Sequence, residues 1–148
     1  MSYQEKQSVV NILSGLAITA VYGWTVYQDH LAGQYDLAED FQKWGVLFLI
    51  FMGVSIVARI IIHIIFHIIN AIATRTEDVP DEDERDKLIK LKATRNSHYA
   101  FSLPFAGAFV GLALGMQIHW IFITFIVSGL LSEIVENLSQ LYYYRKGI

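Results

Sequence analysis

The sequence contains no cysteine. This absence excludes disulfide frameworks, thiolate metal sites and cysteine nucleophiles. A glycine-rich phosphate loop, a GxSxG nucleophile motif and a haem-attachment motif are also missing. Nucleic-acid binding has no support, because the region richest in Lys and Arg, 74–97, holds more acids than bases. We therefore expect a non-enzymatic protein with no cofactor and no nucleic-acid partner.

Apolar residues, in contrast, are abundant and occur in long blocks. Of the 148 residues, 54% are hydrophobic, and the mean hydropathy is +0.41. Four blocks, at roughly 8–28, 44–73, 98–117 and 119–141, are long enough to cross hydrocarbon, which takes about 20 residues. They predict an all-α fold, a bundle of four transmembrane helices that forms a single integral membrane domain over 1–148.

Basic residues are distributed unevenly in this four-span arrangement. Only Lys43 falls on one side of the membrane, and Arg59 lies within a span. The positive-inside rule therefore predicts that both termini and the 74–97 connection are cytoplasmic, in a chain that crosses the cell inner (cytoplasmic) membrane several times. The basic residues on the predicted cytoplasmic side are Lys6, Arg75, Arg85, Lys87, Lys90, Lys92, Arg95, Arg145 and Lys146.

The most charged segment of the chain is PDEDERDKLIKLKATRN, residues 80–96. Pro80 and Asp81 are typical of a helix start, and acidic residues in the first turn favour the positive end of the helix dipole. We expect a charged cytoplasmic helix over about 81–97 that leads into the third span. Its surface is either only solvated or a docking surface for a cytoplasmic partner or for anionic lipid headgroups.

Small residues recur every four positions in two of the predicted spans. They are Gly107, Gly111 and Gly115 in the third span and Gly15, Thr19 and Gly23 in the first. This spacing lets helix backbones approach each other closely in a membrane. The stripes predict helix packing, either inside the bundle or in a homodimer.

A polar stripe interrupts the apolar stretch RIIIHIIFHIIN, residues 59–70. It consists of Arg59, His63, His67 and Asn70. At about 100° per residue, their spacing keeps the four side chains within roughly 80° of one helix face.

The fourth predicted span carries a matching polar face formed by Glu133, Glu136, Asn137 and Gln140. Measured from the outer ends of their spans, Arg59 and the two glutamates lie at the same depth, about 20–24 Å below the outer interface. Because a charge in hydrocarbon costs a few kcal/mol, we expect Arg59 to pair with Glu133 or with Glu136. The histidines would then lie near Asn137 and Gln140.

Three interpretations of this polar cluster stay open at the level of sequence. The first is a structural ion pair that fixes the register of the helices. The second is a proton- or ion-responsive site, because histidine titrates near neutral pH. The third is a metal site in which His63 and His67, four residues apart, are joined by Glu136. The pair of histidines lacks the glutamate of HExxH, so it carries no built-in general base.

Two short motifs resemble a known family. The segment DERDKLIKLKA, residues 83–93, precedes an aromatic-rich span, and the C-terminal region reads QLYYYRKG. This combination resembles a family of small prokaryotic four-helix integral membrane proteins of uncharacterised function, with an Asp-Glu-Arg-Asp motif in the central cytoplasmic loop. The resemblance by itself implies no particular activity. Members are sometimes encoded beside small helix-turn-helix regulators, which suits a sensory or accessory role.

Residues and resemblance together predict an accessory or sensory membrane protein. The alternative is a small proton- or ion-coupled transporter that uses Glu133, Glu136, His63 and His67. The expected partners are the lipid bilayer and either further copies of the chain, as a homo-oligomer, or another membrane protein.

Overall fold

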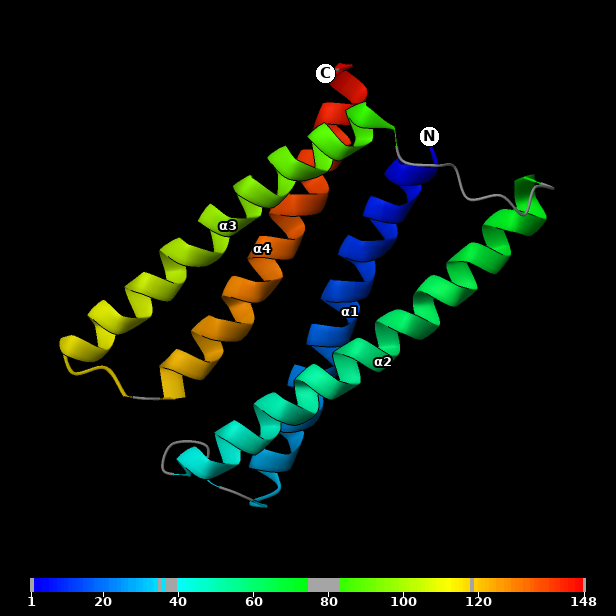
Figure 1. The fold of residues 1–148 in the computed structure, drawn as a ribbon. Coiled ribbons are helices and arrows are strands. Elements are labelled where there is room, and N and C mark those ends of the chain that lie inside the picture. Colours follow the sequence, from blue (N-terminus) through cyan, green and yellow to red (C-terminus); the bar gives the residue numbers. More distant parts are fainter. Residues whose placement is uncertain (1, 35, 37–39, 75–82, 118, 148) are drawn as a thin grey trace.

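A computed structural model describes residues 2–34, 36, 40–74, 83–117 and 119–147 of the chain. These residues form four α-helices and no strand (Figure 1). The helices are α1 (Tyr3–Leu31), α2 (Phe41–Thr74), α3 (Glu84–Ala113) and α4 (His119–Lys146). The prediction of an all-α fold is confirmed.

Three of the helices, α1, α2 and α4, are long and apolar enough to cross a membrane. The helix α3, which begins with the charged stretch ERDKLIKLK, is not among them. It is one continuous helix that joins most of the predicted charged segment to most of the predicted third span. A fourth crossing by α3 therefore stays a prediction.

Both ends of α3 are set by local chemistry. The side chain of Asp83 accepts a hydrogen bond from the backbone N–H of Asp86, so the helix begins at Glu84 rather than near 81, and 81–82 lie outside the described residues. At the other end, Gly115 has a φ of +91°, and the N–H of Met116 donates to the carbonyl of Gly111. This glycine-dependent arrangement ends the helix before the predicted boundary at 117.

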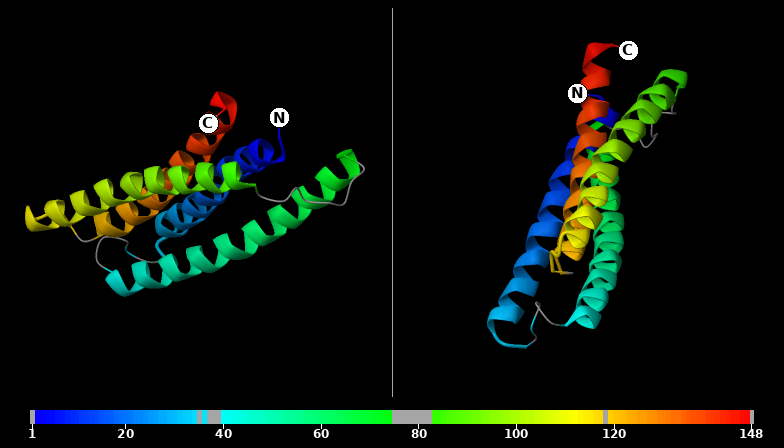
Figure 2. Two further views of the ribbon diagram at one scale, coloured as in Figure 1. Left: turned by 45° about the horizontal axis from the view of Figure 1, so that its top comes forward. Right: turned by 90° about the vertical axis from the view of Figure 1, so that its left-hand side faces the viewer.

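The helices lie in the spatial order α3, α4, α1, α2, with both termini at one end of the molecule (Figures 1 and 2). We call this end the terminal end. The helix α4 packs most extensively against α3 and then against α1, whereas α2 contacts α1 and, over a shorter stretch, α4. Within the described ranges α2 does not contact α3. The bundle is therefore not closed between α2 and α3.

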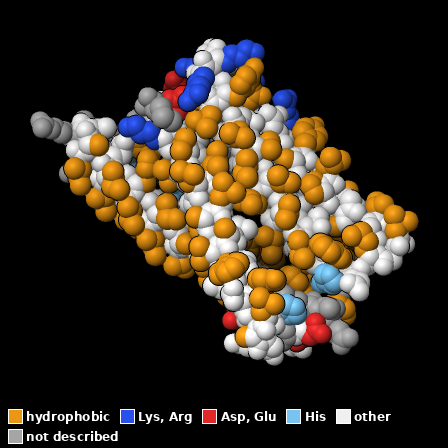
Figure 3. Space-filling view, turned by 180° about the vertical axis from the view of Figure 1, so that it is seen from behind, with side chains coloured by type: hydrophobic (Ala, Val, Ile, Leu, Met, Phe, Trp, Pro, Cys, Tyr) orange, Lys and Arg blue, Asp and Glu red, His pale blue; other side chains and the backbone are white. Residues whose placement is uncertain are grey.

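Apolar side chains lie mainly on the outside of the molecule. Ile72 is 74% exposed, Leu103 79% and Leu114 82%, and hydrophobic side chains cover much of the face in Figure 3. Lys and Arg side chains gather on this face at the terminal end. Exposed apolar surface of this extent is typical of a chain that contacts lipid or another protein.

Polar side chains, in contrast, are common inside. The described residues that are buried and polar are Ser8, Ser14, Ser97, Ser128 and Asn137, whereas the buried hydrophobic ones are Trp44, Ile89 and Ala93. Ser97, for example, lies at the contact between α3 and α4, where its backbone carbonyl accepts a hydrogen bond from the hydroxyl of Ser132. Small polar residues allow close helix approach and cross-helix hydrogen bonds where the solvent is lipid.

Candidate functional site

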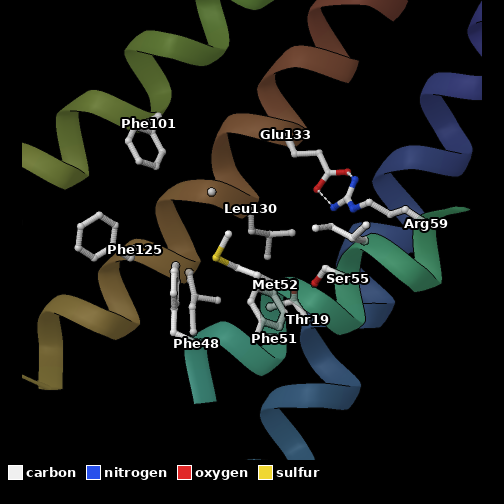
Figure 4. A pocket seen from close by; sticks show the side chains of 13 residues that line it. Thr19, Phe48, Phe51, Met52, Ser55, Arg59, Phe101, Phe125, Leu130 and Glu133 are labelled. Atoms are coloured by element: carbon white, nitrogen blue, oxygen red, sulfur yellow. Dashed lines mark hydrogen bonds and ion pairs between the residues drawn. The ribbon is translucent and has the colours of Figure 1, made fainter. Parts of the chain in front are cut away.

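Arg59 of α2 and Glu133 of α4 form a bidentate ion pair (Figure 4). Nη1 of the guanidinium donates to Oε1 of the carboxylate, and Nη2 donates to Oε2. The Glu133 side chain is only 16% exposed and that of Arg59 is 37% exposed, so the pair lies largely inside the bundle. The parallel geometry is the strongest that these two groups can form. Of the two carboxylates that the sequence left open, the structure brings Glu133 to Arg59.

Gly15 of α1 makes room for this ion pair. A Cβ atom placed on Gly15 would lie 2.6 Å from Oε2 of Glu133 and 3.0 Å from its carboxyl carbon. Real Cβ atoms essentially never approach a neighbour this closely. Three helices therefore define the pair: α2 provides the cation, α4 provides the anion, and α1 provides the space beside it.

The ion pair lies where two cavities meet. The first, which we call the apolar cavity, has a volume of about 520 Å³ and is lined by Phe48 and Phe51 of α2, Phe101 of α3 and other apolar side chains (Figure 4). The second, the polar cavity, has a volume of about 280 Å³ and lies toward the terminal end. Arg59 and Glu133 line both. The pair therefore stands between an apolar and a polar compartment.

The polar residues of α4 bond mainly to α1, not to the histidines of α2. Asn11 donates through Nδ2 to Oδ1 of Asn137 at 3.0 Å, and the hydroxyl of Ser8 donates to Oε1 of Gln140 at 3.3 Å. The expectation that the histidines lie beside Asn137 and Gln140 is therefore not met. The reason is the order of the helices, since α1 lies between α2 and α4 over this part of the bundle.

Two other members of the stripe on α2, His67 and Asn70, contact α1. The hydroxyl of Tyr3 lies 2.9 Å from Nδ1 of His67, and Nζ of Lys6 donates to Oδ1 of Asn70 at 3.5 Å. His63 is half-buried and makes no hydrogen bond within the described part of the chain. The stripe therefore has two sets of partners: Arg59 bonds to α4, whereas His67 and Asn70 bond to α1.

Glu136 faces α3, where its Oε1 accepts a hydrogen bond from the hydroxyl of Thr94 at 3.1 Å. This direction separates it from His67, which faces α1. Within the described residues, no group of three His, Asp or Glu side chains is placed to hold a metal ion. The suggested ligand set of His63, His67 and Glu136 is thus not assembled there.

The glycines of the two predicted packing stripes differ in their surroundings. Besides Gly15, only Gly111 has close neighbours, and these belong to Met116 in the turn that follows α3 rather than to another helix. An added Cβ on Gly23, Gly107 or Gly115 would meet no atom within 4 Å. These three glycines are therefore not at a helix contact inside the described part of the chain.

Sequence reasoning missed several contacts near the terminal end. Tyr144 of α4 donates through its hydroxyl to Oδ1 of Asp86 at 2.8 Å, and Gln4 of α1 donates to Oδ2 of the same carboxylate. Asp86 thus links three helices. Gly15 was predicted as a helix-packing residue, but its contact with Glu133 was not predicted. The available signal was the spacing of three and four residues that places Ser8, Asn11 and Gly15 on one face of α1.

The chain matches no family model, no curated protein and no solved structure. Its function is therefore inferred from the ion pair, the two cavities and the exposed apolar surface.

Proposed function

We propose that the protein is a non-enzymatic, multi-pass protein of the cell inner (cytoplasmic) membrane with a sensory or accessory role. In this proposal α3 crosses the membrane as the fourth span, and both termini are cytoplasmic. Three candidate spans and the Lys and Arg side chains at the terminal end support this assignment. The resemblance to small prokaryotic four-helix membrane proteins is part of the same proposal.

The observation that carries the proposed role is the way α2 is attached. This helix contacts α1 and a short stretch of α4, and in the described residues it has no contact with α3. Its charged link to α4 is the Arg59–Glu133 pair. A helix with few neighbours and one ion pair to the bundle can act as a switch. If the ion pair breaks or forms again, α2 can move relative to the other helices.

A sensory or accessory protein acts through a partner, either another membrane protein, a second copy of the chain or a cytoplasmic protein docked on the charged part of α3. The test is affinity purification from native membranes with the wild-type chain and with Arg59→Leu/Glu133→Leu. The matched control is Arg145→Leu, which breaks an ion pair of 3.5 Å between Arg145 of α4 and Glu5 of α1 and leaves the charged part of α3 intact.

We expect one partner to be enriched with the wild type and the control, and to be lost with the double variant. Equal enrichment with all three chains, or with none, would contradict the proposed role of the pair.

The second candidate function is a small proton- or ion-coupled transporter. It is favoured by the position of Glu133 between the two cavities and by that of Glu136 in the wall of the polar cavity. Proteoliposomes that contain a pH-sensitive dye test it directly. A transporter should give a flux that falls with Glu136→Gln or His63→Ala, and a wild-type chain without flux would eliminate this candidate.

A further inference from the structure

Two residues that line the cavities each have a buried side-chain oxygen without a hydrogen-bond partner. Among the described residues, buried side-chain polar atoms without a partner are Oδ1 of Asn11, Oγ of Ser55 and Nδ1 of His119. Asn11 lines the polar cavity and Ser55 lines the apolar cavity. A buried polar atom without a partner costs about 1–3 kcal/mol, so these atoms favour an occupant that can bond to them.

The orientation of the Asn11 amide follows from its neighbours. Asn137 donates through Nδ2 to the carbonyl of Glu133 at 2.8 Å, so its Oδ1 must accept from Nδ2 of Asn11. The free atom of Asn11 is therefore its oxygen, which is an acceptor. Any group that bonds to this oxygen must therefore be a donor.

The charges around the polar cavity agree with this requirement. Its wall contains the carboxylates Asp86, Glu133 and Glu136 and the cations Arg59 and Lys90, which is one carboxylate in excess. Glu133 is neutralised by Arg59, and Asp86 accepts from Gln4 and Tyr144. Glu136 has only the hydrogen bond from Thr94 and no ion-pair partner among the described residues.

The lining of the apolar cavity places a second requirement on the chemistry of a ligand. Phe48, Phe51, Phe101 and Phe125 surround it in Figure 4, together with Met52. Its volume of about 520 Å³ lies within the range of small-molecule sites, which is about 300–1,000 Å³. An apolar or aromatic body fits this lining, whereas a charged group fits only at the end where Arg59 and Glu133 stand.

We propose that the two cavities form one binding site for an amphipathic organic cation. The apolar body lies among the phenylalanines, and an ammonium group passes the ion pair and donates to Glu136. A small shift of the Asn11 amide would let its oxygen accept a second hydrogen bond. An anionic amphiphile would meet the excess carboxylate, and a neutral one would leave Glu136 without a counter-charge. The site rests on the membrane location proposed above, and it applies to either candidate function.

The test uses three probes with the same body: 4-phenylbutylammonium, 4-phenylbutanol and 4-phenylbutyrate. The full chain is first shown to remain in membranes during alkaline carbonate extraction and is then reconstituted in phosphatidylcholine nanodiscs. Equilibrium dialysis against empty nanodiscs subtracts partition into lipid. We expect the ammonium to bind at least tenfold more tightly than the alcohol or the carboxylate.

Two variants locate the site. Glu136→Gln should reduce ammonium binding at least tenfold and leave alcohol binding unchanged, whereas Glu84→Gln, at a side chain 94% exposed, should change neither. Gly129→Leu should fill the apolar cavity and abolish binding of every probe. Its control is Gly53→Leu, because neither glycine has an atom within 4 Å of an added Cβ and Gly53 does not line the cavity.

The ranking of probes on the wild-type chain needs no variant, so the proposal stays falsifiable if Glu136→Gln does not fold. Equal binding of the three probes, a preference for the carboxylate, or no binding above empty nanodiscs would overturn it. Unchanged ammonium binding by folded Glu136→Gln would do the same. Release of the chain by carbonate would instead overturn the proposed membrane function, so the two failures are distinguishable.

Discussion

Gly15 of α1 and Glu133 of α4 are so close that a methyl group on the glycine would lie 2.6 Å from the carboxylate oxygen Oε2. The glycine lies one helical turn beyond Asn11, on the face of α1 that meets α4. The absence of a side chain at this position lets the carboxylate lie against the α1 backbone while it holds Arg59. Gly15 is therefore a positioning residue for the ion pair.

Gly15→Ala should destabilise the protein. The added methyl group must displace the Glu133 carboxylate, which the two bonds to Arg59 hold in place, and overpacking of this kind costs about 1–3 kcal/mol. Gly23→Ala is the matched control, because an added Cβ there meets no atom within 4 Å and should stabilise α1 by about 0.5–1 kcal/mol. Thermal unfolding in detergent, followed by circular dichroism, checks both variants. A rise in stability with Gly15→Ala equal to that with Gly23→Ala would contradict the close contact.

Arg59→Leu should destabilise the protein more than Arg59→Leu/Glu133→Leu. The single variant leaves a largely buried carboxylate without a counter-charge, which costs about 3–5 kcal/mol for a fully buried pair. A smaller loss is expected here, because the Arg59 side chain is 37% exposed and water screens the charge. Chemical denaturation in detergent measures the difference.

Arg59→Leu/Glu136→Leu serves as the control for the choice of carboxylate. Glu136 bonds to Thr94 rather than to Arg59, so removing it should not restore stability. Recovery with Glu136→Leu equal to that with Glu133→Leu would show that the wrong acid has been assigned to the pair.

Asn11 and Asn137 should show energetic coupling across α1 and α4. Their side chains share a hydrogen bond of 3.0 Å, and Asn137 is only 4% exposed. A double-mutant cycle with Asn11→Ala and Asn137→Ala should give a coupling of about 0.5–1.5 kcal/mol. The cycle of Asn11→Ala with Asn96→Ala is the control, since Asn96 bonds instead to Ser139 and Tyr143 and should show no coupling. Equal coupling in both cycles would contradict a specific bond.

The absence of cysteine allows a clean test of topology, because each introduced cysteine is the only one in the chain. We expect a membrane-impermeant maleimide to label Gln34→Cys and Met116→Cys in intact spheroplasts, and Leu91→Cys only after permeabilisation. All three positions are exposed in the structure. Labelling of Leu91→Cys and Met116→Cys from the same side would show that α3 does not cross the membrane.

The polar stripes show which parts of the fold and of the site could be predicted from the sequence. The apolar blocks predict the four helices, because a chain in lipid must satisfy its backbone hydrogen bonds within each segment. Equal depth along two spans brings Arg59 to the level of Glu133 and Glu136. Periodicity cannot choose between these two acids, because they differ by less than one turn and both lie in the C-terminal half of α4.

That choice depended on where the other helices lie. The placement of α1 between α2 and α4 gives His67 and Asn70 partners on α1, and the packing of α3 on α4 gives Glu136 a partner in Thr94. The close contact between Gly15 and the Glu133 carboxylate likewise depends on how α1 packs against α4.

By itself, the sequence determined that the chain forms long apolar helices, that polar side chains share one face of two of them, and that basic residues concentrate near one end. These properties follow from local periodicity and composition. Only the tertiary structure decided which carboxylate meets Arg59, which residues line the two cavities, and that α2 stands apart from α3. These properties depend on the packing of helices far apart in sequence, and no repeat within one helix encodes its neighbours.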